Sequence, residues 1–402
     1  MVRIAAFEVE QWMDEYEVTP GCLNIAETCA ASVSIDELVG LSEDKNAPGP
    51  VDFSTKLVYG PIRGSPALRQ RVADLCGRDG TSAPSVLGEE DVLITQGAIG
   101  ANFLLLYTLV NPGDHVICVY PTYQQLYSVP ESLGASVSLW RLKKENAFVP
   151  DVKELEGLVR SNTKVIIINN PNNPTGAPIP KALLEQIIAF AKARDIVVFS
   201  DEVYRPLFHD VFDKDSATPP PITTLGYDKV VVSGSMSKSY ALAGIRIGWI
   251  ASKERRIIEA IASARDYTTI SVSRIDDQIA SYALSKPVWE PLLKRNVALA
   301  NTNKALLEAF IKKHADVCSW VRPKAGTTAF VQFSRNGKPV DDVQFCLDVL
   351  NMTKVFFVPG SKCFGNGVDF AGYVRIGYVC HTEVLEEALQ KLTAYLESDF
   401  AE

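Results

Sequence analysis

Long hydrophobic runs are missing from this sequence of 402 residues. Its longest apolar stretches, such as Phe103–Tyr107 and Val165–Ile168, are far too short to cross a bilayer, so no membrane partner is expected. A basic excess is missing too: the net charge is −8, which argues against a nucleic-acid partner because such partners require a basic face. Residues 1–17 carry several acids and no apolar core, so we expect neither a secretory signal nor a transit peptide.

Paired cysteines and clustered histidines are also missing. The eight cysteines are scattered without a CxxC spacing, which favours reduced thiols and a cytoplasmic protein over a disulfide framework. The four histidines lie far apart, so no metal site is expected; they are His115, His209, His314 and His381.

Apolar runs alternate with helical patterns through the middle of the chain. The predicted strands are Asp91–Thr95, His115–Tyr120, Lys164–Asn170, Val197–Glu202 and Lys229–Ser235. Strands that are apolar throughout and separated by helices indicate a parallel sheet covered on both faces, and therefore an α/β fold.

The chain is longer than one hydrophobic core usually supports, so a second, smaller domain is expected. A helical segment from Ile275 to about His314 is followed by short alternating stretches and a terminal helix from Thr382. We predict a small α+β domain formed by residues 1–48 and 291–402, and a large domain formed by residues 49–290.

Polar residues follow the ends of the predicted strands. They are Gln96–Gly97, Tyr120–Tyr123, Asn169–Asn173, Asp201–Tyr204 and Ser235–Lys238. Since ligands of such sheets lie beyond the carboxyl ends of the strands, these residues are expected to meet in one cleft.

Lys238 is a single cation among small residues, and its neighbours suggest an anion site. The hydroxyls of Ser235 and Ser237 lie beside it, and Arg246 follows eight positions later as a possible phosphate ligand. Gly97 begins a predicted helix, where free backbone amides bind anions; the alternative is a simple tight turn.

Asp201 directly follows a buried strand, where an unpaired carboxylate is costly, so it needs a cationic partner unless it only caps a helix. Asn173 and Tyr204 add polar groups to the same cleft. A ligand with an aldehyde, a phosphate, a basic ring nitrogen and a phenolic oxygen would satisfy all of these residues. Pyridoxal 5′-phosphate is that molecule, with Lys238 forming a Schiff base to the aldehyde and Asp201 pairing with the ring nitrogen.

Seven motifs, in order, resemble those of class I/II aminotransferases of pyridoxal-phosphate fold type I. They are "YGPIRGSPALR", "TQGAIGAN", "YPTYQQLY", "NNPNNPTG", "SDEVY", "SGSMSKSYALAGIRIGW" and "YVRIGYV". The resemblance covers nearly the whole chain. It implies a mostly parallel sheet of the seven-stranded type and an enzyme that acts on the α-carbon of an L-amino acid.

The resemblance also implies roles for individual residues. Lys238 would carry the Schiff base and move the proton, Asp201 would pair with the ring nitrogen, and Tyr123 would stack on the ring. The 3-hydroxyl would meet Asn173 and Tyr204, and the phosphate would meet Gly97, Ala98, Ile99, Ser235, Ser237 and Arg246. Arg375 would clamp the substrate α-carboxylate near Asn173. Tyr59 would reach the phosphate of a neighbouring subunit, which implies a homodimer.

One segment departs from the family pattern. Where many aminotransferases carry a Gly-Pro or Gly-Glu-Pro element, this chain has Leu23–Leu38, whose "NIAET" resembles aminocyclopropane-carboxylate synthases and capreomycidine-synthase-like enzymes. Glu27 would then face the substrate and favour a cationic or leaving-group side chain; alternatively, it caps a turn. Arg265 and Arg274 are the candidates for binding a distal carboxylate.

The resemblance makes transamination the expected reaction. Elimination, replacement, cyclisation or oxidation on the same cofactor is the alternative, because of the "NIAET" segment. A transcription regulator of the same fold is disfavoured, since such proteins add an N-terminal DNA-binding domain and this chain is acidic.

Overall fold

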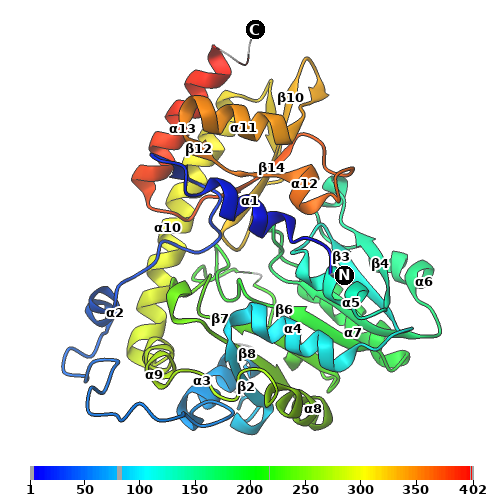
Figure 1. Ribbon diagram of the computed structural model, residues 1–402, viewed down its shortest axis with the longest axis vertical. Coiled ribbons are helices and arrows are strands. Elements are labelled where there is room, and N and C mark those ends of the chain that lie inside the picture. Colours follow the sequence, from blue (N-terminus) through cyan, green and yellow to red (C-terminus); the bar gives the residue numbers. More distant parts are fainter. Residues whose placement is uncertain (1–3, 79–83, 217, 399, 401–402) are drawn as a thin grey trace.

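The centre of the molecule is a seven-stranded sheet in the strand order β2-β8-β7-β6-β5-β3-β4. This computed structural model describes residues 4–78, 84–216, 218–398 and 400. The strands are β2 (Val92–Gln96), β3 (His115–Tyr120), β4 (Ser136–Arg141), β5 (Thr163–Asn169), β6 (Val197–Asp201), β7 (Val230–Ser235) and β8 (Ile247–Ser252). Only β8 runs against its neighbours β2 and β7. The predicted, mostly parallel sheet is therefore confirmed (Figure 1).

Helices bury both faces of this sheet. On β5, Val165 and Ile167 join one apolar cluster and Ile166 and Ile168 join the other, as the two-residue period of a strand requires. The first cluster includes α4 (Gly97–Leu109), α5 (Gln125–Ser132) and α8 (Arg255–Arg265). The second includes α3 (Pro66–Gly77), α7 (Lys181–Ala193) and α9 (Arg274–Ala283). Continuous apolar strands are thus buried on both sides.

Two strands of the sheet carried no clear signal in the sequence. The edge strand β4 is only partly buried and mixes serine with apolar residues, so it lacks the continuous apolar run of its neighbours. The strand β8 is fully buried, but Gly248 interrupts its apolar pattern.

A smaller antiparallel sheet lies in the C-terminal part of the chain. Its strands are β10 (Thr328–Arg335), β11 (Lys338–Pro339), β13 (Val358–Pro359) and β14 (Tyr373–Gly377), and β9 (Cys318–Trp320) also pairs with β10. The helices α11 (Asp342–Thr353) and α13 (Thr382–Glu397) pack against each other above it (Figure 1).

The N-terminal segment folds onto these C-terminal elements. The strand β1 (Leu23–Asn24) pairs in parallel with β12 (Val355–Phe356), and the helix α1 (Glu8–Tyr16) packs against α12 (Gly360–Phe364). In Figure 1, α1 lies between the smaller sheet and the carboxyl side of the large sheet. The helix α1 is thereby placed near the strand ends.

The helix predicted from Ile275 to His314 is two helices. The helix α9 ends at Ala283, and α10 (Lys286–Lys313) begins after Ser285, whose backbone is extended. Pro287 explains the break, because its ring would clash with the carbonyl of Ala283 and it has no N–H to donate. The domain boundary predicted at residue 290 falls inside α10, and it stays a prediction.

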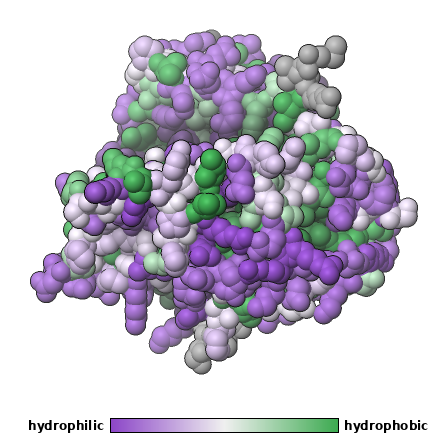
Figure 2. All heavy atoms as spheres, turned by 60° about the horizontal axis from the view of Figure 1, so that its bottom comes forward, coloured by the Kyte–Doolittle hydropathy of each residue, from purple (hydrophilic) through white to green (hydrophobic). Residues whose placement is uncertain are grey.

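Hydrophilic residues cover most of the face shown in Figure 2, and apolar residues gather in separate groups among them. Several large apolar side chains are exposed near residues 53–62, and Tyr267 is also exposed. Among the described residues, no helix has the length and apolar character needed to cross a membrane.

Candidate active site

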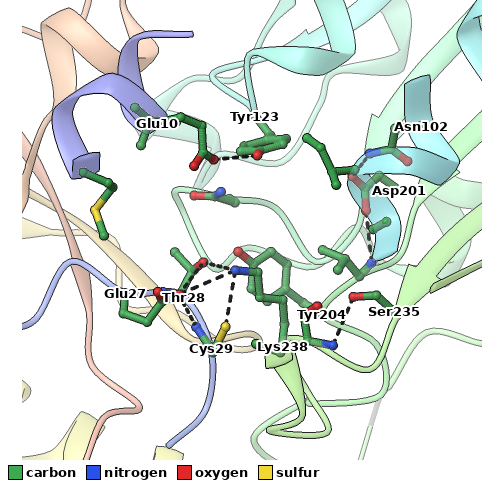
Figure 3. A pocket seen from close by; sticks show the side chains of 18 of the residues that line it. Glu10, Glu27, Thr28, Cys29, Asn102, Tyr123, Asp201, Tyr204, Ser235 and Lys238 are labelled. Carbon is green, nitrogen blue, oxygen red and sulfur yellow. Dashed lines mark hydrogen bonds and ion pairs between the residues drawn. The ribbon is translucent and has the colours of Figure 1, made fainter. Parts of the chain in front are cut away.

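A cavity of about 540 Å³ lies at the carboxyl ends of β5, β6 and β7, and α1 and the loop after β1 cover it. The side chains of Lys238, Asp201 and Tyr204 converge there from different elements (Figure 3). The predicted cleft is therefore real, and its position follows from the common direction of the parallel strands.

The start of α4 forms a cradle for an anion. Gly97 has a φ of +70°, and a side chain there would come within 3.0 Å of Nη2 of Arg246. A Cβ on Gly248 would lie 2.4 Å from the carbonyl carbon of Gly97, so only glycine allows this close approach of β8 to α4. Ser235 and Ser237 line the same side of the cavity. Helix N–H groups, hydroxyls and a guanidinium together suit a phosphate.

Asp201 is a buried carboxylate that forms no salt bridge with any cationic side chain in the described part of the chain. It is 3 % exposed, and its oxygens accept hydrogen bonds from Nδ2 of Asn102 at 3.0 Å and from the N–H of Val203 at 3.1 Å. Burial raises the pKa of Asp201 to about 6, and these two hydrogen bonds together with the more distant Lys238 oppose that rise. A cationic ring N–H would stabilise this carboxylate.

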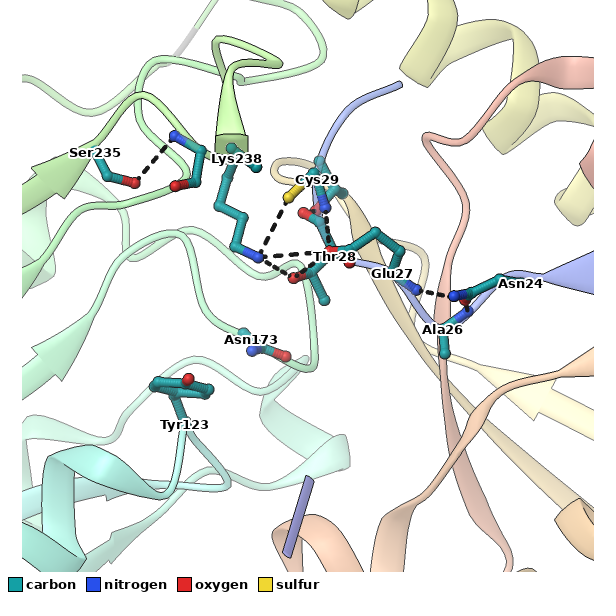
Figure 4. A network of polar contacts seen from close by, with 12 residues as sticks. Asn24, Ala26, Glu27, Thr28, Cys29, Tyr123, Asn173, Ser235 and Lys238 are labelled. Carbon is teal, nitrogen blue, oxygen red and sulfur yellow. Dashed lines mark hydrogen bonds and ion pairs between the residues drawn. The ribbon is translucent and has the colours of Figure 1, made fainter. Parts of the chain in front are cut away.

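Lys238 follows β7 and is held by the segment after β1. Its Nζ donates to Oγ1 of Thr28 at 2.5 Å and lies 3.5 Å from Sγ of Cys29 and 3.6 Å from Oε1 of Glu27 (Figure 4). The backbone N–H of Ala30 also donates to the carbonyl of Lys238 at 3.2 Å. Residues far apart in the sequence thus fix the amine inside the cavity.

The proton affinities around Lys238 are coupled. Burial by itself lowers the pKa of the Lys238 ammonium, but the negative charges that Cys29 and Tyr204 gain at high pH, together with the carboxylate of Glu27, raise that pKa above its ordinary value. Burial raises the pKa of Cys29 to about 11 and also raises the pKa of Tyr204, so both stay neutral near pH 7. Glu27 is the anion of the group. Burial opposes its ionisation, but Lys238 and the hydrogen bonds from Cys29 and Thr28 lower the pKa of Glu27 to about 2.

An aromatic ring and two polar groups complete the ligand side of the cavity. Tyr123, Asn173 and Tyr204 all line it. The N–H of Asn173 donates to Oδ1 of Asn169 at 2.7 Å, which fixes the loop after β5. The Tyr123 hydroxyl donates to Oε1 of Glu10 at 2.7 Å (Figure 3). These contacts hold the aromatic face and the amide in place.

Arg375 on β14 is a buried cation with unused hydrogen-bonding capacity. It is 3 % exposed, and its Nη2 donates to the carbonyl of Ala26 at 2.9 Å, while Nη1 lies 3.4 Å from Oδ1 of Asn173. Its Nε has no partner among the described residues. Since a buried charge without a counter-ion is costly, a bound carboxylate would stabilise this guanidinium.

These observations fit pyridoxal 5′-phosphate together with an amino acid. The cradle at Gly97 suits the phosphate, Asp201 suits a protonated ring nitrogen, and Lys238 offers an amine for the aldehyde. Among the described residues, no cluster of His, Cys, Asp and Glu has the arrangement of a metal site. The cradle, the buried carboxylate and the amine together suit an organic cofactor that carries a phosphate, a ring nitrogen and an aldehyde.

Most residues singled out in the sequence meet in this cavity. Those that line it are Glu27, Ala98, Ile99, Tyr123, Asn173, Asp201, Tyr204, Ser235, Ser237, Lys238, Arg246 and Arg375, and Gly97 adjoins Arg246. Tyr59 does not: it is 84 % exposed and lies in a separate surface hollow with Arg274. Arg265 does not line the cavity either; it donates to the backbone carbonyls of Ile62 and Ile270.

Several other residues line the cavity that the sequence analysis did not single out. Phe7, Glu10, Met13 and Glu17 reach the cavity from α1 and its C-cap, and no motif marks that helix. Asn102, the hydrogen-bond partner of Asp201, could have been found from the sequence, because it lies five positions after Gly97 and ends the motif "TQGAIGAN". Thr28 and Cys29 directly follow Glu27.

Comparison with known proteins agrees with this geometry. Residues 43–392 match the family model described as aminotransferase class I and II. A solved structure of a PLP-dependent aminotransferase from Streptococcus suis is 38 % identical, with a TM-score of 0.86 and 98 % of each chain covered. An aspartate aminotransferase of Thermotoga maritima is 29 % identical over 85 % of this chain and 84 % of its own. A capreomycidine synthase of Streptomyces vinaceus is 29 % identical over 76 % and 74 %.

Proposed function

This chain belongs to the family of class I and II aminotransferases, and we propose a role in that chemistry for each group of its cavity. It is a pyridoxal-5′-phosphate-dependent aminotransferase, which takes the amino group of an L-α-amino acid and passes it to a keto acid. The observation that carries the proposal is Lys238, an amine that shares one cavity with the buried carboxylate of Asp201. When bound, the cofactor supplies a protonated ring that withdraws electrons from the substrate α-carbon.

The chain's residues divide into those that hold the cofactor and those that hold the substrate. Asp201 would hold the ring nitrogen, and Tyr123 would stack on the ring. Asn173 and Tyr204 would bind the ring hydroxyl. The phosphate would take the amides of Gly97, Ala98 and Ile99, the hydroxyls of Ser235 and Ser237, and the guanidinium of Arg246. Arg375, next to Asn173, would bind the substrate carboxylate with two parallel hydrogen bonds.

In this proposal Lys238 is the general base. With its Nζ free, Lys238 would remove the proton from the substrate α-carbon and hold that proton at Nζ. This requires an unprotonated Nζ close to the α-carbon, although the carboxylate of Glu27 favours its charged form. The hydroxyl of Thr28, 2.5 Å from Nζ, holds the amine in position without adding charge.

Elimination and cyclisation were the alternative suggested by the segment around Glu27. The matched family and the Streptococcus suis structure favour transamination instead. Capreomycidine synthase and aspartate aminotransferase are both relatives, so the names of relatives do not choose the substrate.

We further propose that two copies of the chain form a dimer through the exposed apolar residues near Tyr59. Phe53 is 96 %, Leu57 is 77 % and Tyr267 is 93 % exposed in the single chain, which is unusual for such large side chains. Light scattering should give twice the mass of the chain. Tyr59→Phe should weaken retention of the cofactor if its hydroxyl reaches the neighbouring phosphate.

The eight unpaired cysteines support the cytoplasm as the compartment.

The test is a titration of the purified holoprotein with single amino acids, followed by absorbance, without a keto acid. We expect one equivalent of a new keto acid per chain and a loss of the original absorbance band, which an added keto acid restores. Product that accumulates over many turnovers without an acceptor would show that transamination is the wrong reaction. An original band that survives in Lys238→Ala would overturn the assignment of Lys238.

A further inference from the structure

The charged side chains of the cavity do not balance once the cofactor and the substrate carboxylate are assigned. The cations that line it are Lys238, Arg246 and Arg375, and the anions are Glu10, Glu17, Glu27 and Asp201. Under the proposed function, the three cations and Asp201 are all engaged. Three glutamates remain, and none has a counterpart on the cofactor or on the α-carboxylate.

Two of these glutamates are presented by the N-terminal helix. Glu10, Met13 and Glu17 are spaced by three and four residues, which places them on the face of α1 that meets the cavity. The other acids of the helix behave differently. Glu8 pairs with Lys362 at 2.9 Å outside the cavity, and Asp14 and Glu15 do not line it. The acidity facing the cavity is therefore specific to one side of the helix.

The carboxylates of Glu10 and Glu27 are fixed in position. The Tyr123 hydroxyl donates to Glu10 at 2.7 Å, and burial together with Glu10 raises the pKa of Tyr123, so it remains a neutral donor. The backbone N–H groups of Thr28 and Cys29 donate to Oε1 of Glu27 at 2.6 and 3.0 Å (Figure 4). Such preorganised acceptors bind a cation without first rearranging.

Glu17 has no ion pair among the described residues. Burial raises the pKa of Glu17, and the charges of Glu27, Asp14 and Glu10 raise it further, so the glutamates repel one another across the cavity mouth. A cation among them would relieve this repulsion.

Glu27 depends on Lys238 for its counter-ion. The two groups lie 3.6 Å apart while the lysine amine is free. While Lys238 engages the cofactor, before a substrate displaces it, that ion pair is absent, and a half-exposed carboxylate faces the incoming substrate. A dicarboxylic substrate would meet this negative charge, and the cavity offers no arginine besides Arg246 and Arg375 in the described part of the chain.

We infer that the enzyme selects L-amino acids whose side chain ends in a cation, an amine or a guanidinium, which Glu10, Glu17 and Glu27 bind. This inference rests on the proposed function, because it takes the α-carboxylate to Arg375 and the α-amine to the cofactor. It assigns a role to Glu27 and extends the substrate site to the helix α1.

The test compares each cationic amino acid with a neutral one of the same shape. L-arginine is paired with L-citrulline and L-lysine with L-norleucine. Binding is measured by calorimetry on holoprotein reduced with borohydride, in which the cofactor stays fixed on Lys238 and no reaction occurs. We expect the cationic member of a pair to bind roughly 30-fold more tightly, near the lower end of the range measured for close charge pairs at binding interfaces.

Variants locate the effect. Glu17→Gln should reduce the cationic preference several-fold, and a variant with Glu10→Gln, Glu17→Gln and Glu27→Gln should reduce it to within about threefold. Glu15→Gln removes the same charge from the same helix outside the cavity and should keep the preference. Glu17 contacts neither Lys238 nor Arg375, so its variant leaves their hydrogen bonds intact.

The possible results separate the two proposals. Equal binding of arginine and citrulline, or an undiminished preference in the triple variant, would overturn the cationic selection even if the enzyme transaminates. Failure of every amino acid to release a keto acid would overturn the proposed function, while the calorimetric comparison would still decide the charge preference.

Discussion

Asp201→Asn should stabilise the cofactor-free protein while it weakens the cofactor site. The pKa of Asp201 rises from 3.8 to about 6 because the carboxyl is buried. A raised pKa means that the fold favours the protonated acid, so this contribution to stability is complete below about pH 4 and is lost as the pH rises through about 6. A shift of about two pKa units corresponds to on the order of 3 kcal/mol. Asparagine keeps the shape and does not ionise.

The structure also accommodates the new amide. Oδ1 of Asn102 has no hydrogen-bond partner among the residues that the structure describes. After a rotation of the Asn102 side chain, this oxygen can accept from the amide of residue 201. For 402 residues, an unfolding entropy of about 2.1 cal/mol/K per residue converts 3 kcal/mol into a gain of roughly 3–4 °C in Tm.

The assay is thermal unfolding of cofactor-free wild type and variant from pH 4 to 8. The two Tm values should nearly coincide at pH 4 and separate until about pH 6.5. With cofactor bound the order should reverse at pH 7, because the ring then pairs with the carboxylate in the wild type only. Asp228→Asn, at an exposed turn before β7, is the control, because it removes one negative charge from the surface and not from the cavity. Parallel Tm curves for wild type and Asp201→Asn would refute the reasoning.

Three further changes test other parts of the structure. Arg375→Lys should lower amino-acid affinity by roughly 100-fold in the absorbance titration, because an ammonium cannot form the bidentate pair; an equal loss of cofactor affinity would contradict this role. Gly248→Ala should raise the cofactor Kd at least about tenfold in equilibrium dialysis, since its Cβ would lie 2.4 Å from Gly97, whereas Gly244→Ala meets nothing and should not. Burial lowers the pKa of Lys304 to about 8, so wild-type Tm should gain a contribution between pH 8 and 10.5 that Lys304→Met lacks; identical pH profiles would argue against it.

Much of the large domain could be predicted from the sequence because its signals are local. The strand His115–Tyr120 is continuous and apolar, and the structure has β3 within the same bounds. The polar residues after β5, β6 and β7 could be assigned to one cleft, since parallel strands bring their carboxyl ends to one edge. The strand β8 could not be recognised, because it turns back beside β7 with a glycine at its close contact with α4.

The helix break between Ala283 and Lys286 could have been predicted. Pro287 was visible in the sequence, and its effect on the preceding turn is general. The apolar pattern of residues 275–314 concealed it, because both helices bury one face.

The amino-acid sequence by itself determined the family, the apolar strands that carry the site and the polar residues that follow them, since each depends on short motifs. Only the tertiary structure decided that α1 covers the cavity. The hydrogen bond from Tyr123 to Glu10 joins residues 113 positions apart, and the bond from Lys238 to Thr28 spans 210. An amphipathic helix shows in its sequence which side is apolar. Which neighbour its polar side meets depends on how the whole chain packs.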